Sequence, residues 1–353
     1  MKAGQWWGLL ARNGFRVSPR RLDIALGVSI FSPFNNVLSA IQSVFYGRKI
    51  EQATLTDDPI FILGHWRSGT TLLHELMGVD ERFASPSTYQ CFAASHFLVS
   101  EWAMVRFGNF LIPKKRPMDE MEAGWKLPQE DEFALMNLGA PTPYLRMAFP
   151  HSPPPAMEFL DMQNVEPSKL QLWRDKLTWF VRALTIRHPG KRLIMKSPPH
   201  TGRIAELLKL YPKAKFIHLA RDPRKLFYST VRLWHALDEV QALQTPKSQT
   251  ELQDYVWTCF NQMYAAYESQ RHEIPAGQLI ELRYEDLVAE PFETIRTIYD
   301  RLALGDFESV EANLNKRLAN HKSYRTNSHS IDAETEKLIL ERWHRYAERF
   351  GYT

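Results

Sequence analysis

A glycine-bounded segment has the most chemically suggestive spacing in the chain. Gly64 and Gly69 fit the pattern G-x-x-x-x-G, and the hydroxyl residues Thr70 and Thr71 follow. In phosphate-binding loops of this spacing, backbone N–H groups at a helix N-terminus bind an oxyanion. ATP and GTP enzymes carry a lysine after the second glycine, whereas this chain has Thr70 there and places its cation inside the loop, at Arg67. The sequence therefore predicts a loop that binds a single phosphate beside a transferring group.

A second basic position follows another apolar run. Arg221 comes directly after residues 216–220, and the next two residues, Asp222 and Pro223, suit the N-cap and the first turn of a helix. Ligands of α/β proteins bind at the carboxyl ends of parallel strands. Arg221 therefore lies where a ligand could bind, and Ser229 follows about two turns along the helix. Taken alone, the Arg-Asp-Pro triplet is equally well explained as a strand-to-helix junction.

Alternating strands and helices would position these residues. Apolar runs predict strands at 59–63, 193–195, 216–219 and 279–282. Helical spacing follows most of them, at 70–77, 170–187, 204–210, 223–237, 251–270 and 295–302. This alternation is typical of βαβ units, and we predict an α/β, P-loop-like three-layer fold with a central parallel sheet flanked by helices.

The chain divides into two predicted parts. We expect residues 1–57 to form a helical segment packed on the core, and residues 58–353 to form the main domain, with a proline-rich covering region at about 88–160 that could line a substrate site. Residues 24–47 carry no charge, but Pro33 and several polar residues interrupt them. We therefore favour a buried or covering helix over a membrane span, and a peripheral membrane contact stays open.

Composition excludes several classes of protein. The 353 residues include 44% hydrophobic and 24% charged residues, which argues against intrinsic disorder. A net charge of +4 gives no support to nucleic-acid binding. The two cysteines, Cys91 and Cys259, are too few for a disulfide framework and favour a reducing compartment, so we predict a cytoplasmic protein, with membrane association left open. Metal-ligand spacing is absent, and no metal is expected.

The loop resembles a known family. Arg67, Ser68, Gly69, Thr70 and Thr71, placed after a strand, are similar to the 5′-phosphosulfate loop of sulfotransferases that use 3′-phosphoadenosine 5′-phosphosulfate (PAPS). The Arg-containing version occurs in tyrosylprotein and many bacterial sulfotransferases. The resemblance covers roughly residues 58–300. It implies that these five residues bind the donor and that the chain is a PAPS-dependent sulfotransferase.

The same resemblance assigns further donor contacts. Arg221 and Ser229 match the family's Arg and Ser that hold the 3′-phosphate. Tyr284 opens a Tyr-Glu-Asp-Leu stretch whose tyrosine lies near the adenine, although a core tyrosine explains it equally well. Residues near the C-terminus often complete this site in the family. The available residues are Lys322, Tyr324 and Arg325, but the usual glycine-rich pattern is missing here, so no role is assigned to them.

Sulfuryl transfer needs cations for the developing charge and a base for the acceptor proton. Lys196 ends a predicted strand and matches the lysine that stabilises the leaving oxygen in the family, and we give Arg67 a share of this role. His200 lies four residues after Lys196 and is our predicted base, since a histidine is readily neutral near pH 7. The rival bases are three consecutive carboxylates, Glu130, Asp131 and Glu132, and His65 is held in reserve.

Two other classes of function stay open on the sequence. A P-loop kinase or NTPase would share the fold, although Thr70 in place of lysine counts against it. A nucleotide-binding or membrane-peripheral scaffold would draw support only from residues 24–47. The expected partner is an acceptor that carries a hydroxyl or amine, either a small molecule, a glycan or a lipid. Neither the acceptor nor the oligomeric state can be read from the sequence.

Overall fold

A five-stranded parallel sheet forms the centre of the molecule. The computed structural model describes residues 1–108, 112, 123–320 and 333–352. The strands are β1 (Ile60–Leu63), β2 (Phe83–Ala84), β3 (Arg192–Lys196), β4 (Lys215–Ala220) and β5 (Leu279–Arg283), arranged in the order β2-β3-β1-β4-β5. Every adjacent pair is parallel. The predicted α/β class is confirmed.

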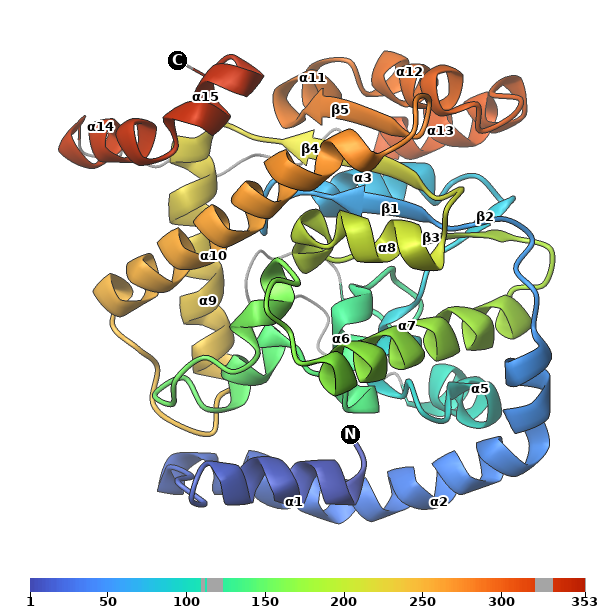
Figure 1. Ribbon diagram of the computed structural model, residues 1–353. Coiled ribbons are helices and arrows are strands. Elements are labelled where there is room, and N and C mark those ends of the chain that lie inside the picture. The colour runs from blue at the N-terminus through green and yellow to red at the C-terminus, as the bar shows by residue number, and fades with distance from the viewer. Residues whose placement is uncertain (109–111, 113–122, 321–332, 353) are drawn as a thin grey trace.

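Helices cover both faces of this sheet (Figure 1). Alternate residues of β1 point to opposite sides, so that Ile60 and Ile62 belong to one apolar core while Phe61 and Leu63 belong to the other. The first core is closed by α3 (Thr70–Met77), α11 (Tyr284–Ala289), α12 (Pro291–Leu302) and α13 (Glu308–Asn320). The second is closed by α7 (Pro167–Arg187), α8 (Ile204–Leu210), α9 (Pro223–Gln241) and α10 (Gln249–Gln270).

The predicted strands coincide with β1, β3, β4 and β5, and the predicted helices with α3, α7, α8, α9, α10 and α12. Only two residues long, β2 gives no apolar run that could be recognised in the sequence. At the C-terminal end, α14 (Ala333–Arg342) and α15 (His344–Phe350) add Trp343, Tyr346 and Phe350 to the second core.

The covering region is made of short elements. It contains α4 (Thr88–Phe92), α5 (Phe97–Phe107), α6 (Asp131–Leu138) and the 3₁₀ turns η3 (Pro143–Ala148) and η4 (Met157–Leu160). Helix α6 packs against α4, α7 and η3. This packing brings its N-terminal residues to β3 and to the turn η5 (Pro198–Gly202), which follows β3.

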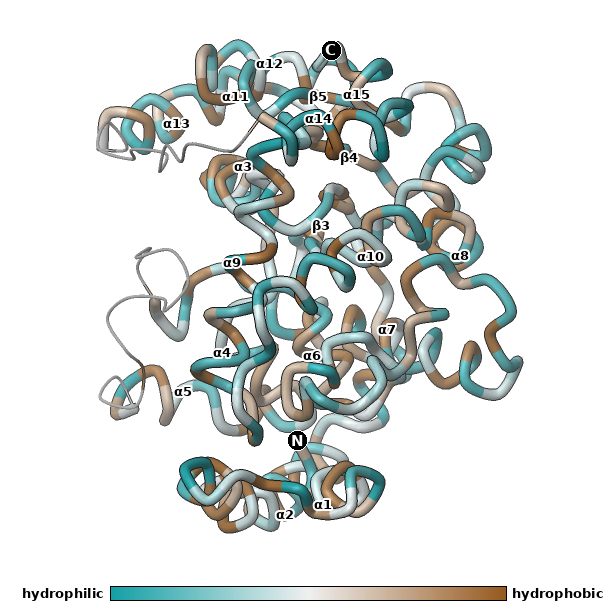
Figure 2. Tube along the Cα trace, turned by 90° about the vertical axis from the view of Figure 1, so that its left-hand side faces the viewer, coloured by the Kyte–Doolittle hydropathy of each residue, from teal (hydrophilic) through white to brown (hydrophobic). Residues whose placement is uncertain are grey.

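The N-terminal segment is a pair of helices at the far side of the molecule from β5. Helix α1 (Ala3–Arg12) and the long helix α2 (Leu22–Gln52) run side by side and form a separate layer below the covering region (Figures 1 and 2). Trp6, Leu9 and Leu10 of α1 are buried in a small third core with Phe149 and Leu243. Helix α2 is continuous through Pro33 and contacts α5 and α7.

Candidate active site

The candidate site lies where three neighbouring strands end. Lys196 is the last residue of β3 and is paired with Ile62 of β1, while Gly64 follows β1 and Arg221 follows β4. Because β1 lies between β3 and β4, the three chain segments leave the same edge of the sheet side by side. The loop is fixed at its start, where the Gly64 N–H donates to Thr201 Oγ1 at 2.8 Å.

The glycine loop adopts a conformation that only part of its sequence could predict. Gly69 has a φ of +96° and is the N-cap of α3, and a Cβ atom at this position would lie 2.1 Å from the Tyr284 ring. Any residue with a side chain would therefore clash there. Arg67 is also left-handed, with a φ of +69°, which is uncommon for a residue with a side chain. The loop thus keeps the first N–H groups of α3 turned toward the sheet edge.

The two predicted anion sites meet. Arg67 Nε donates to Ser229 Oγ at 2.9 Å, and Arg221 Nη1 donates to the Arg67 carbonyl oxygen at 2.7 Å. The Arg221 guanidinium also lies 4.4 Å from the centre of the Tyr284 ring. Residues assigned separately to the 5′-phosphosulfate, the 3′-phosphate and the adenine therefore form one contiguous cluster.

A tyrosine that the sequence analysis missed holds Arg221. The Tyr346 hydroxyl accepts from the Arg221 N–H at 2.8 Å and lies 2.9 Å from the Arg221 carbonyl oxygen, to which it donates. Tyr346 comes from α15, more than a hundred residues further along the chain, and no spacing motif marks it. The predicted C-terminal residues Lys322, Tyr324 and Arg325 lie outside the described residues.

Two polar atoms of this cluster lack a partner. Ser68 Oγ and Arg221 Nε are both shielded from solvent, and neither finds a hydrogen-bond partner among the residues that the structure describes. A buried donor without a partner costs free energy, so such atoms are rare unless a ligand completes them. A phosphate or sulfate oxygen is the acceptor that a hydroxyl and a guanidinium would share. The residues present therefore fit an anionic donor.

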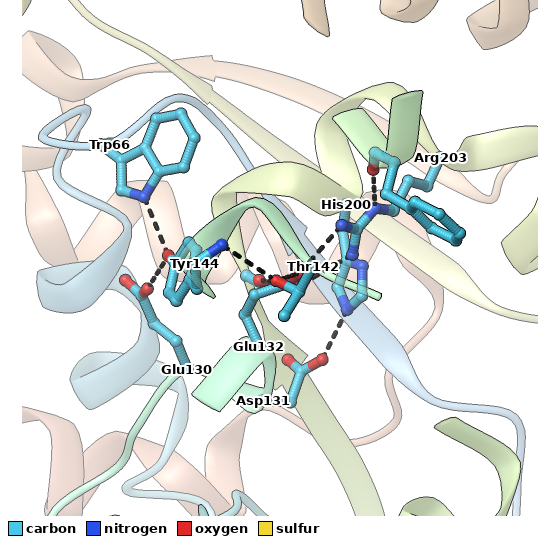
Figure 3. Close-up of polar contacts among 10 residues, drawn as sticks. Trp66, Glu130, Asp131, Glu132, Thr142, Tyr144, His200 and Arg203 are labelled. Carbon is cyan, nitrogen blue, oxygen red and sulfur yellow. Dashed lines mark hydrogen bonds and ion pairs between the residues drawn. The ribbon is translucent and has the colours of Figure 1, made fainter. Parts of the chain in front are cut away.

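A second polar chain runs away from Lys196. Lys196 Nζ donates to Glu130 Oε1 at 2.8 Å. The Tyr144 hydroxyl donates to Glu130 Oε2, and Trp66 Nε1 donates to the Tyr144 hydroxyl at 2.8 Å (Figure 3). Burial, and next the charge of Glu130, raise the pKa of Tyr144 well above its ordinary value. Tyr144 therefore stays protonated and holds the carboxylate of Glu130 from the side opposite Lys196.

The next two carboxylates face other partners. His200 Nε2 lies 2.6 Å from Asp131 Oδ2, and both side chains have no exposed surface. Burial alone would raise the pKa of Asp131, but the facing imidazole and its hydrogen bond bring that pKa below its ordinary value. Arg203 donates to both oxygens of Glu132, at 2.7 and 2.9 Å. His200, Asp131 and Glu132 thus tie α6 to η5 and do not reach open space.

His65, the reserve candidate, is also enclosed. Its side chain has no exposed surface, Nδ1 lies 3.1 Å from the Trp66 carbonyl oxygen, and the ring packs edge-on against Trp66. Burial lowers the pKa of His65 to about 3, so the ring is neutral near pH 7. Within the described residues, no group of His, Cys, Asp and Glu side chains could hold a metal ion.

An apolar cavity of about 500 Å³ is lined in part by Tyr144, the residue that is hydrogen-bonded to Glu130. It lies between α1, α2, α6 and η3, and Trp6, Leu9, Val28, Met136 and Met147 are among its lining residues. Through its hydroxyl, Tyr144 connects the cavity to Glu130. Neither Tyr144 nor Trp66 was singled out in the sequence, because each is one aromatic residue among many. The site as a whole can bind an anion at the sheet edge and an apolar molecule in the cavity, with Glu130 and Tyr144 between them.

Comparisons with known proteins agree on one family. A family model described as "Sulfotransferase family" matches residues 59–309. The chain is 40% identical, over 98% of its length and 89% of the relative's, to a protein named omega-hydroxy-beta-dihydromenaquinone-9 sulfotransferase Stf3, present in Mycobacterium bovis and Mycobacterium tuberculosis. Two solved structures share the fold. Sulfotransferase STF9 from Mycobacterium avium has a TM-score of 0.71 and 18% identity, with 95% of this chain and 86% of that chain covered. Sulfotransferase STF1 from Mycobacterium tuberculosis has a TM-score of 0.63 and 16% identity, with coverages of 97% and 91%.

Proposed function

Because the chain belongs to the sulfotransferase family and is a sulfotransferase, we propose that it transfers a sulfuryl group from PAPS, the donor that the family implies, to a hydroxyl of a lipid-like acceptor. The family match sets aside the alternatives of a kinase or NTPase and of a scaffold without activity. One observation carries the proposal: Tyr144 lines the apolar cavity and donates a hydrogen bond to Glu130, which is paired with Lys196.

The donor is assigned to the cluster at the sheet edge. The loop residues Arg67, Ser68, Gly69, Thr70 and Thr71 hold the 5′-phosphosulfate through the N-terminus of α3. The 3′-phosphate is held by Arg221 and Ser229, and the adenine is contacted by Tyr284. Ser68 Oγ and Arg221 Nε, which have no hydrogen-bond partner in the part of the chain that the structure describes, support this assignment, as does the contact between Arg67 and Ser229 at 2.9 Å.

Glu130, in place of the predicted His200, takes the role of general base. Its side chain is 17% exposed, and it is the one carboxylate of the consecutive three that is bonded to a residue lining the cavity. His200, by contrast, is fully enclosed and bonded to Asp131. Glu130 accepts the proton that the acceptor hydroxyl releases, which contributes typically about 10²–10⁴-fold to a rate.

Lys196 and Arg67 offset the charge that builds up on the departing oxygen. When bound, PAPS supplies the sulfuryl group and a phosphate leaving group. Lys196 ends β3 directly beside the phosphate loop, and its Nζ is held by Glu130 at 2.8 Å, so this cation is oriented before the reaction begins. A cation fixed in advance stabilises developing charge without having to reorganise.

The acceptor is a molecule with a reacting hydroxyl and a long apolar part. The relative that shares 40% identity is named for a hydroxylated dihydromenaquinone. The apolar cavity, which Tyr144 links to Glu130, supports an acceptor of the same class for this chain, because cavities of this size and lining bury apolar ligands. Such a molecule resides in a membrane, so the proposal includes the peripheral contact through residues 24–47 that the sequence left open.

A transfer assay with sulfur-labelled PAPS tests this function. The purified full chain is given, in detergent micelles, either a polyprenyl quinol with a terminal hydroxyl or a water-soluble phenol. We expect kcat/KM to be about tenfold or more higher for the polyprenyl acceptor, because only this acceptor fills the apolar cavity.

The opposite preference would remove the lipid-like acceptor from the proposal while leaving the transferase activity in place. Isothermal titration with 3′,5′-adenosine bisphosphate, which needs no acceptor, checks the donor site separately.

A further inference from the structure

Helix α2 turns its apolar side chains toward solvent and its polar side chains toward the protein. The apolar residues of α2 that are exposed by 59% to 80% include Leu26, Ile30, Phe34, Val37, Val44 and Phe45, while Ala25 and Ile50 are buried. The exposed residues recur at helical spacing and form one side of the helix. The buried side consists largely of polar residues, namely Ser32, Ser39 and Gln42. Water-soluble surface helices have the opposite arrangement.

The polar side of α2 is bonded to the rest of the molecule. Gln42 Oε1 accepts from the Leu98 N–H of α5 at 2.8 Å, Asn35 Oδ1 lies 3.1 Å from His96 Nε2, and Asn35 Nδ2 donates to the Met1 carbonyl oxygen at 2.9 Å. Helix α2 is the helix within the described residues that is long and apolar enough to cross a membrane, and 17% of its apolar stretch is buried. Crossing a bilayer would break these polar contacts and expose the freed groups to hydrocarbon, which is costly. The helix therefore lies along the protein body, with its apolar side facing outward.

Cations stand at both ends of this apolar side. Exposed arginines precede it at positions 12, 16 and 20, and Arg48 and Lys49 follow it. Between Asp23 and Glu51 the helix has no acidic residue. A helix of 31 residues, about 46 Å long, with an exposed apolar face and basic ends has the pattern of helices that lie in a membrane interface. Each such cation adds about 1 kcal/mol of attraction to an anionic lipid surface.

We propose that the exposed apolar side of α2 docks on a bilayer that contains anionic lipids, with the helix axis parallel to the membrane. The proposal deepens the function proposed above, from which it takes the lipid-like acceptor and the peripheral contact through residues 24–47. The cavity is continuous with this surface, since Ile24, Val28 and Phe31 of α2 line it. Phe31 is also 65% exposed, so one side chain belongs to both the cavity wall and the outer face. An acceptor can thus pass from the bilayer to Tyr144 along an apolar path.

Vesicle flotation of the full chain tests the docking surface. Vesicles of phosphatidylcholine are compared with vesicles that also contain phosphatidylglycerol. The test variant carries Phe34→Gln and Val44→Gln, two exposed positions of α2 that do not line the cavity. The matched control carries Val288→Gln and Leu338→Gln, exposed apolar positions of α11 and α14. We expect the original chain to float with the anionic vesicles, the test variant to bind them about tenfold or more weakly, and the control to bind normally.

Several outcomes would overturn the proposal. One is that the original chain floats with neither kind of vesicle, and another is that the test variant floats as well as the original chain. A third is a dimer, detected by light scattering, that Phe34→Gln with Val44→Gln dissociates. A second copy of the chain, and not a membrane, would then cover α2. A second variant, Leu26→Gln with Val37→Gln, repeats the test should the first melt at a lower temperature.

Sulfuryl transfer to an acceptor dispersed in detergent separates docking from the proposed function. We expect the test variant to keep this activity. Normal transfer without vesicle binding would remove the docking surface and leave the function intact. Vesicle binding without transfer to any apolar acceptor would leave the docking surface in place and contradict the proposed function.

Discussion

The proposed donor side and the proposed acceptor side of the site are built in different ways. On the donor side, the loop after β1 and the residue after β4 are held by backbone geometry, and the Tyr284 ring leaves no room for a Cβ atom at Gly69. The acceptor cavity is enclosed by side chains of α1, α2, α6 and η3, which come from distant parts of the sequence. Donor binding therefore depends on a few exact backbone positions, whereas the cavity can change with its side chains. Glu130 lies between the two.

The strongest test of this division changes Glu130, where both sides meet. In Glu130→Gln we expect kcat to fall by about 10²–10⁴-fold because the amide cannot accept the proton. The affinity for 3′,5′-adenosine bisphosphate should stay within about twofold, since no donor contact is removed. Stopped assays give kcat, and isothermal titration gives the affinity.

Glu158→Gln, in the same covering region, is the matched control and should keep normal turnover. The opposite result would be a folded His200→Asn protein that loses turnover and a Glu130→Gln protein that keeps it. His200 would then be the general base, in the same segment as Lys196.

The donor side alone is tested at Arg221. Arg221→Ala removes the guanidinium that lies against Tyr284 and donates to the Arg67 carbonyl oxygen. We expect the affinity for 3′,5′-adenosine bisphosphate to fall by about 100-fold, the size of one lost charge-assisted anion contact. Titration calorimetry measures the change.

Arg224→Ala serves as the control, because Arg224 is on the same helix but is paired with Asp222 at 2.9 Å. Normal bisphosphate binding by Arg221→Ala would take Arg221 out of the donor site.

The acceptor side alone is tested by filling the cavity. Gly27 lines it, and a Cβ atom at this position would meet nothing within 4 Å. Gly27→Leu should therefore raise KM for a long apolar acceptor by about tenfold while kcat with a short alcohol is unchanged. The melting temperature should not fall, because replacing glycine inside a helix is favourable.

Gly47→Leu makes the same substitution in the same helix, where a Cβ atom also meets nothing within 4 Å, but Gly47 does not line the cavity. This control should change KM neither for the long apolar acceptor nor for the short alcohol. An equal rise in KM for both acceptors would mean that the cavity does not hold the acceptor chain.

The smallest expected effect concerns the stability of the strand beneath the donor site. His218 of β4 is fully buried, and burial lowers its pKa to about 3 from an ordinary value of 6.5. The unfolded chain therefore takes up a proton first as the pH falls, and stability is lost below about pH 6.5. His218→Phe should reduce the loss of unfolding free energy between pH 6 and pH 5 by about 1 kcal/mol.

Urea unfolding at the two pH values measures this difference. Tyr264→Phe removes the hydroxyl 3.2 Å from His218 Nε2 and should leave the pH dependence as it is. An unchanged pH dependence in His218→Phe would show that the donor side is not sensitive to acid at this strand.

The sequence predicted most of what is local. The central strands were recognisable as apolar runs. The structure brings Arg67 and Arg221, which lie beyond the ends of two of these strands, into contact at 2.7 Å. Local patterns carry this information because the carboxyl ends of parallel strands share one edge of the sheet.

Residue roles that depend on packing between distant parts of the chain could not be predicted from local sequence patterns. Glu130 was one of three equivalent carboxylates until folding gave each a different environment. Tyr144 reaches Glu130 through the packing of η3 on α6, and Tyr346 reaches Arg221 from the far end of the chain. The outward apolar side of α2 was hidden in a segment that is uncharged on all sides, so that its periodicity gave no orientation.

The start of α6 has a consequence for how the protein can diverge. Glu130, Asp131 and Glu132 follow one another directly, yet they bond to Lys196, His200 and Arg203 respectively. Successive helical residues point about 100° apart, so each carboxylate reaches only its own partner. Inserting or deleting one residue between Glu130 and Glu132 would therefore separate at least one of these carboxylates from its partner, whereas the residues before Glu130 are not helical and do not fix these directions.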